Sequence, residues 1–89
     1  MRKIHKYFIN HDNVEVGISV PVGSRAISVD SQENVSCIYY QFDVVNEYTM
    51  EMRRVIAVWT GREARIGPYD VFVGTTTDSN GTVRHVFEL

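Results

Sequence analysis

The chain has 89 residues, a formal net charge of −2, 44% hydrophobic residues and 22% charged residues. This composition is typical of a globular protein and excludes a disordered chain, and the length allows one domain over residues 1–89. The acidic balance argues against a protein that binds duplex DNA, because such proteins carry a strong basic excess.

The first half of the chain has the alternation expected of strands. Residues 4–9 predict an N-terminal strand, and residues 14–20 place Val or Ile at every second position, which indicates a half-buried strand. Pro21 begins a turn that leads to a strand near 25–30, and 31–34 form a polar break. Residues 35–45 predict the longest strand, with Ile38, Tyr40, Phe42 and Val44 on one face and Cys37, Tyr39, Gln41 and Asp43 on the other.

The middle of the chain combines two patterns. Apolar residues between Tyr48 and Trp59 have helical spacing, yet 55–59 is rich in β-branched residues, which favour strands. We predict a turn or helical kink at 47–51 and a strand over 53–60, broken by Gly61. Strands over 70–77 and 82–89 follow, joined by a hairpin turn at 78–81. The pattern predicts an all-β fold, a small antiparallel sandwich or barrel of about seven short strands.

The expected location and assembly of the protein rest on features that the sequence lacks. Residues 1–20 contain no stretch typical of a signal peptide, and no apolar run approaches the roughly 20 residues that cross a bilayer. The single cysteine, Cys37, cannot form an internal disulfide, so we expect a cytoplasmic protein and a buried Cys37. A chain this short has a small core and exposed strand edges, so we expect a homo-oligomer.

Signatures of catalysis are absent from the sequence. None of the three histidines stands at metal-ligand spacing with another histidine or with Cys37, and no nucleophile motif or glycine-rich phosphate loop occurs. We therefore expect a protein that is not an enzyme and has no metal or cofactor. A hydrolase that uses carboxylates alone stays an open alternative, because strands bring distant Asp and Glu residues together.

The segment 60–65 is the strongest candidate for binding an anion. Gly61 allows backbone N–H groups to approach a ligand, and Thr60 supplies a hydroxyl. Arg62 and Arg65 share a face if the loop makes one helical turn, and their planar guanidinium groups suit phosphate. The alternative is an ordinary surface loop with exposed arginines.

Aromatic side chains flank this segment. Trp59 and Tyr69 lie on either side of it, where they would stack against a base, and we also include Arg54 and Arg84 among the candidate ligand residues. Most aromatic residues in so small a domain are simply core. We expect His85, which alternates with Val83 and Phe87, to be a core or interface residue rather than a ligand.

Four segments together resemble a known family: 21–29 (PVGSRAISV), Thr60-Gly61, 73–75 (VGT) and 81–88 (GTVRHVFE). With Lys6-Tyr7 in the first strand, they make the chain similar to a family of small all-β tailed-phage proteins of unknown function. The resemblance implies a phage protein that acts in the cytoplasm of an infected bacterial host. By analogy of setting, it suggests a protein that sequesters an immune signal.

Three classes of function therefore compete. The first is a non-catalytic protein that sequesters a small anionic, nucleotide-type immune signal. The second is a protein–protein adaptor or inhibitor, or a minor phage structural protein, that uses a strand edge or an aromatic face. The third is an enzyme acting on such nucleotides. We adopt the first as the working hypothesis, with no membrane and no duplex nucleic acid among the partners.

Overall fold

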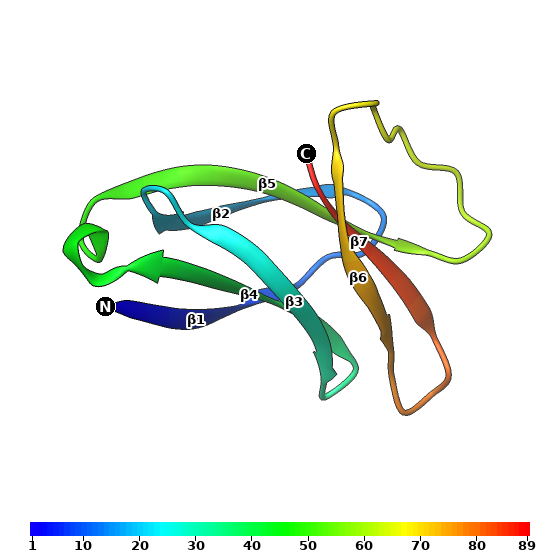
Figure 1. Cartoon of the computed structure of the whole chain (residues 1–89). Coiled ribbons are helices and arrows are strands. Elements are labelled where there is room, and N and C mark those ends of the chain that lie inside the picture. Colours follow the sequence, from blue (N-terminus) through cyan, green and yellow to red (C-terminus); the bar gives the residue numbers. More distant parts are fainter.

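The computed structural model describes residues 1–89 and contains seven strands and one short 3₁₀ helix (Figure 1). In chain order the elements are β1 (Arg2–Ile9), β2 (Glu15–Pro21), β3 (Arg25–Gln32), β4 (Val35–Asp43), η1 (Val44–Asn46), β5 (Met50–Trp59), β6 (Val71–Thr77) and β7 (Val83–Glu88). The prediction of an all-β chain with seven strands is confirmed. No helix in the chain has the length and apolar character needed to cross a membrane.

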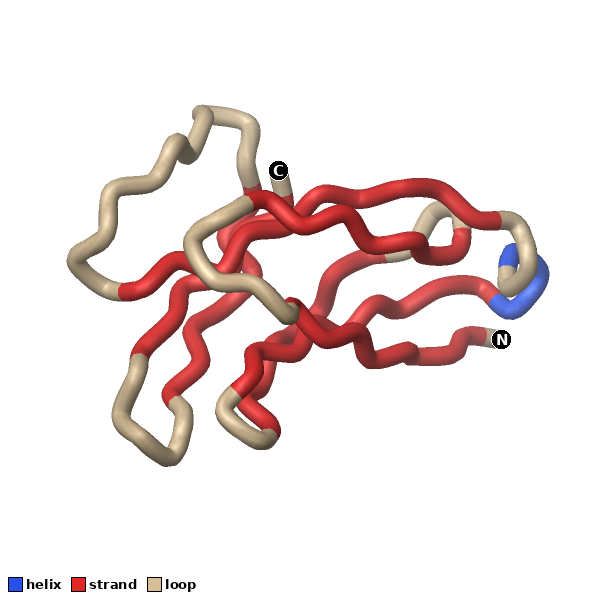
Figure 2. Tube along the Cα trace, turned by 180° about the vertical axis from the view of Figure 1, so that it is seen from behind, coloured by secondary structure: helices blue, strands red, loops and turns tan.

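The strands form two antiparallel sheets, so the architecture is the sandwich rather than the barrel. One sheet has the order β1-β4-β3 and the other the order β2-β5-β7-β6. Figure 1 shows the β6–β7 hairpin running steeply across the end of the molecule where β3 ends. Seen from behind, η1 and the N-terminus lie at one end, and the long loop between β5 and β6 projects at the other (Figure 2).

The core lies between the sheets and is built by the alternating residues of β2, β4 and β5. Because side chains alternate across a strand, every second residue points inward. The buried cluster consists of Ile9, Ile18, Val20, Ile38, Tyr40, Val55, Ala57 and Val86. Cys37 is also fully buried, as expected from the sequence.

Polar contacts also join the two sheets. The hydroxyls of Ser36 on β4 and Thr76 on β6 are hydrogen-bonded at 2.8 Å. The Tyr40 hydroxyl donates to Glu88 Oε2 at 2.5 Å, and Arg53 donates to the same carboxylate at 3.2 Å. Burial and the bond to Glu88 raise the pKa of Tyr40, so its hydroxyl stays protonated and holds β4 to β7.

The ambiguous middle of the chain is a strand. Residues 50–56 pair with β2 on one side, and 55–59 pair with β7 on the other. Burial of the β-branched run between the two sheets therefore outweighs its helical spacing. The kink expected at 47–51 lies earlier, because η1 occupies Val44–Asn46, where the Asp43 side chain accepts a hydrogen bond from the Val45 N–H. Val44, expected on the apolar face of the preceding strand, belongs to this 3₁₀ helix instead.

Two features of the backbone set the register and the distance between the sheets. Glu33 and Asn34 both have positive φ and form the two-residue turn between β3 and β4, which matches the twist of a hairpin. Gly74 lets β6 approach β3 closely, because a Cβ built there would lie 2.6 Å from Val29 Cγ2.

Candidate functional site

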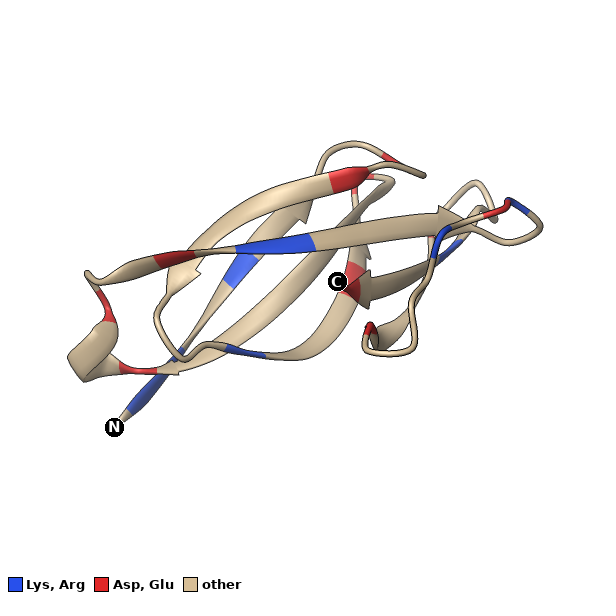
Figure 3. Ribbon diagram, turned by 90° about the horizontal axis from the view of Figure 1, so that it is seen from above, with Lys and Arg blue, Asp and Glu red and all other residues tan.

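The loop of residues 60–70 between β5 and β6 contains five of the predicted ligand residues: Thr60, Gly61, Arg62, Arg65 and Tyr69. Its first turn is fixed by two backbone bonds, from the Thr60 N–H to the Val83 carbonyl and from the Arg62 N–H to the Trp59 carbonyl, each at 3.1 Å. Gly61 has φ of +87°, a conformation that other residues rarely adopt. Basic and acidic residues both lie on this loop, as Figure 3 shows.

Beside this turn lies a hollow of about 310 Å³, here called the loop hollow. The structure brings four predicted residues to it, together with two residues of β7 that we did not predict as ligands. Val58, Ala64 and Ile66 complete its apolar lining. The predicted residues are Trp59, Thr60, Gly61 and Arg62, and those from β7 are His85 and Phe87.

His85 lies between two hydroxyl groups at this hollow. Its Nε2 is hydrogen-bonded to the Thr60 hydroxyl at 2.7 Å, and its Nδ1 to the Thr75 hydroxyl at 3.1 Å. A hydroxyl donates or accepts, so these two bonds fix the orientation of the ring in either of its protonation states. His85 is thus a satisfied side chain on the open face of the sheet, at a position that borders a ligand-sized space.

Trp59 borders the hollow from its edge. Trp59 pairs with Arg84 and Val58 pairs with His85, so alternation places the Trp59 side chain on the sheet face opposite to His85. Its indole N–H donates to Asp12 Oδ2 and its backbone N–H donates to Asn13 Oδ1, each at 2.9 Å. The aromatic side chain on the hollow's own face is therefore Phe87.

The structure does not bring Arg84 to the loop hollow. Its guanidinium is buried, donates to Asp78 Oδ2 at 2.7 Å and places Nε 2.9 Å from Asp12 Oδ2. Burial alone would lower the pKa of Arg84, but the bonds to Asp78 and Asp12 outweigh it and raise this pKa. The same guanidinium lowers the pKa of Asp78. This arginine stabilises the fold around Trp59.

The remaining predicted residues lie outside the loop hollow. Arg54 and Arg65 line a separate depression with Glu15 and Asp70, and Arg54 pairs with Glu15 at 3.2 Å. Acidic and basic groups balance there, which is unfavourable for an anion. The Tyr69 side chain is exposed to solvent and lines neither space. No group of three or more His, Cys, Asp or Glu side chains is placed to hold a metal ion.

The comparisons with known proteins identify the family of the chain and no more. The whole chain, residues 1–89, matches a family described as a domain of unknown function, DUF7352. The chain belongs to this family. The comparisons found no match among curated proteins or solved structures.

Three of the four sequence segments singled out above meet at His85, which lines the loop hollow. Thr60 comes from the Thr-Gly pair, Thr75 from 73–75 and His85 from 81–88, and the His85 ring bonds to both threonines. The sequence signal for His85 was its place two residues before Phe87 on one face of a strand. Its polar contacts depend on the pairing of β7 with both β5 and β6, which no local pattern reveals.

Proposed function

We propose that this protein is a non-catalytic binding protein that captures a small anionic, nucleotide-type ligand in the loop hollow. The observation that carries the proposal is the amphipathic lining of this space. Apolar side chains, including Val58, Ile66 and Phe87, form one part, and Thr60 and Arg62 supply polar groups. Its volume of about 310 Å³ lies at the lower end of the range for small-molecule sites.

The chemistry of the lining matches the two halves of a nucleotide. Phe87 and the edge of the His85 ring offer a surface for a base, because aromatic rings stack on bases of any sequence. Arg62 takes part in none of the ion pairs of the protein, so its guanidinium is free to bind a phosphate with two parallel bonds. The Thr60 hydroxyl, hydrogen-bonded to His85 at 2.7 Å, adds a further polar group to the lining.

The surroundings of His85 favour binding over turnover. A histidine that acts as general base is usually oriented by a carboxylate, which stabilises the imidazolium that forms. Both ring nitrogens of His85 bond to neutral hydroxyls instead. We therefore expect a bound ligand to be released chemically unchanged.

The biological setting is part of the proposal. The four motifs of the sequence resemblance suggest that the chain is encoded by a tailed phage and acts in the cytoplasm of an infected bacterium. There it would sequester a nucleotide-type immune signal, with a homo-oligomer providing several copies of the site.

A panel of ligands tests the proposal. Purified protein is heated with adenosine monophosphate, cyclic dinucleotides and ADP-ribose, and its melting temperature is recorded for each. We expect at least one nucleotide to raise the melting temperature in proportion to the logarithm of its concentration, and chromatography to recover that nucleotide intact. No shift with any of them, or recovery of a cleaved product, would contradict the proposal.

A second candidate function is an adaptor that binds another protein through an aromatic face. It is favoured by Phe72, which contacts Phe87 edge-on at 5.4 Å between ring centroids and is 54% exposed. Exposed aromatic side chains are typical of protein interfaces. Replacing Phe72 with Ser separates the two candidates, because it would abolish binding by an adaptor but leave the nucleotide-dependent melting shift in place.

A further inference from the structure

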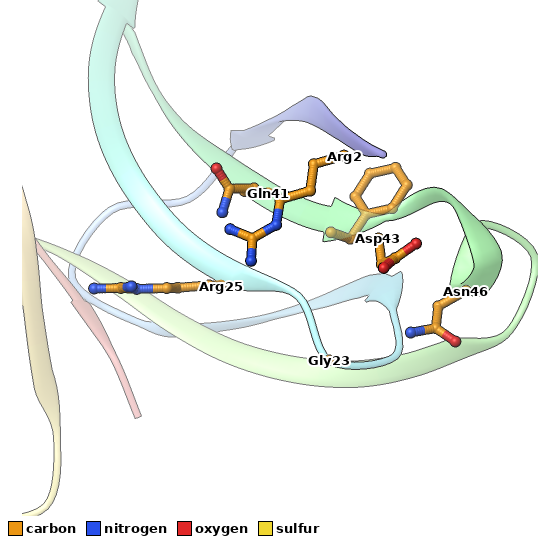
Figure 4. A pocket seen from close by; sticks show the side chains of 7 residues that line it. Arg2, Gly23, Arg25, Gln41, Asp43 and Asn46 are labelled. Atoms are coloured by element: carbon orange, nitrogen blue, oxygen red, sulfur yellow. The ribbon is translucent and has the colours of Figure 1, made fainter.

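A second pocket lies at the opposite end of the molecule from the loop hollow, beside η1 and the N-terminus. It has a volume of about 250 Å³, and we call it the arginine pocket (Figure 4). Its polar lining comes from β1, the turn after β2, β3, β4 and η1. The residues are Arg2, Gly23 with its backbone, Arg25, Gln41, Asp43 and Asn46, and Phe42 completes the lining.

The register of the first sheet explains why two arginines line this pocket. Gln41 and Asp43 alternate with the buried residues of β4 and so lie on the outer face of the sheet. Arg2 on β1 is paired with Asp43, and Arg25 on β3 is paired with Gln41. The two arginines therefore flank β4 on the same face, separated across the sheet by two strand spacings, or about 10 Å.

Both guanidinium groups lack an acidic partner. None of the six ion pairs of the protein includes Arg2 or Arg25, whereas Arg53, Arg54 and Arg84 all have carboxylate partners. In Figure 4 the Arg2 guanidinium reaches across Gln41 toward β3, and the Arg25 side chain extends away from it. Arg25 is exposed, so its side chain has room to change rotamer toward a ligand held by Arg2.

The other polar groups refine the kind of anion that fits. The amides of Gln41 and Asn46 supply N–H donors. Asp43 uses Oδ1 to accept the bond from the Val45 N–H at 3.1 Å, which leaves Oδ2 able to accept a hydrogen bond from a ligand hydroxyl. The same carboxylate repels a densely charged polyanion, as does the net charge of −2 of the chain.

We propose that the arginine pocket binds the phosphate group of a small phosphorylated compound that also carries a hydroxyl group. Arg2 and Arg25 hold the phosphate from both sides of β4, and the amides of Gln41 and Asn46 add hydrogen bonds. Asp43 Oδ2 accepts a hydrogen bond from the ligand hydroxyl. This site is independent of the loop hollow, so either proposal stands if the other fails.

The test uses glycerol 3-phosphate and inorganic phosphate as probes in NMR titrations of the full-length, ¹⁵N-labelled protein. We expect the Arg2 and Arg25 side-chain Nε–H signals and the Gln41 and Asn46 amide signals to shift, with glycerol 3-phosphate bound more tightly than phosphate. Arg2→Gln and Arg25→Gln each weaken binding at least tenfold, because charge-assisted bonds to phosphate are strong. The matched control Arg54→Gln, an exposed arginine on the other sheet, leaves the affinity unchanged.

Asp43→Asn tests the role of the carboxylate, since asparagine also caps a helix start. It should tighten binding of inorganic phosphate and reduce the preference for glycerol 3-phosphate. Three results would overturn the proposal: shifts confined to other parts of the chain, equal affinities for the wild type and both arginine variants, or displacement of glycerol 3-phosphate by a single-stranded DNA oligonucleotide. The last would assign the pocket to a nucleic-acid backbone.

Discussion

β3 and β6 approach each other closely where Gly74 faces Val29. We therefore predict that the effect of Gly74→Ala on stability depends on the side chain at residue 29. A Cβ at residue 74 would lie 2.6 Å from Val29 Cγ2, whereas ordinary contacts of this kind measure 3.4–4 Å. Val29 packs against the core cluster, so it cannot move freely away. Gly74→Ala should therefore overpack this contact and lower the free energy of unfolding by about 1–3 kcal/mol.

The same substitution should be harmless once the opposing methyl groups are gone. Gly74 does not have positive φ, so alanine fits its backbone, and alanine in a strand is more stable than glycine by about 0.5–1 kcal/mol. In a Val29→Ala background we expect Gly74→Ala to be neutral or stabilising. The coupling free energy between the two positions should then be at least about 1 kcal/mol.

Urea denaturation of the four proteins, followed by circular dichroism, measures this coupling. The wild type and the two single variants complete the cycle with the double variant. If Gly74→Ala has the same cost in both backgrounds, the two side chains do not meet, and the packing of β3 on β6 described above is incorrect.

Three further predictions concern stability and assembly. Arg84→Met should lower the urea midpoint much more than the control Arg54→Met, because it leaves the buried Asp78 without its cation, whereas Arg54 is exposed. The bond from Arg84 lowers the pKa of Asp78, and the bond from Arg53 lowers that of Glu51. The stability that these two bonds contribute is therefore complete above the ordinary carboxyl pKa values. It is lost as the pH falls toward the pKa values of the folded state. The melting temperature should therefore decrease on acidification and should not increase. Light scattering at micromolar concentration should give a dimer or a larger assembly, and a mass near 10.2 kDa over a wide concentration range would contradict the expected oligomer.

Period-two alternation made most of the fold predictable. It located β2 and β4 and the inward-facing Ile18, Val20, Ile38 and Tyr40. It did not locate η1, because a 3₁₀ turn of three residues depends on the Asp43 cap and has no periodic signal. The helical spacing between Tyr48 and Trp59 was misleading since both β2 and β7 pair with this segment.

The candidate site was predictable only where it is local in sequence. Trp59, Thr60, Gly61 and Arg62 are consecutive, so one turn keeps them together. Arg84 was predicted as a ligand residue because it is a cation. Its buried partner Asp78 lies across a hairpin turn, so the sequence did not show that Arg84 is paired inside the fold. The placement of Arg2 and Arg25 at one pocket requires the pairing of two distant strands with β4, which composition and spacing do not specify.

Calorimetric titration of two arginine variants tests the proposed function most directly. Arg62 lines the loop hollow and Arg65, three residues later on the same exposed loop, does not. With the nucleotide that raises the melting temperature most, Arg62→Gln should weaken binding by about 10- to 150-fold. This factor corresponds to the loss of a hydrogen bond to a charged group, which contributes about 1.5–3 kcal/mol. Arg65→Gln should bind like the wild type. Equal affinities for all three proteins would contradict nucleotide capture at the loop hollow.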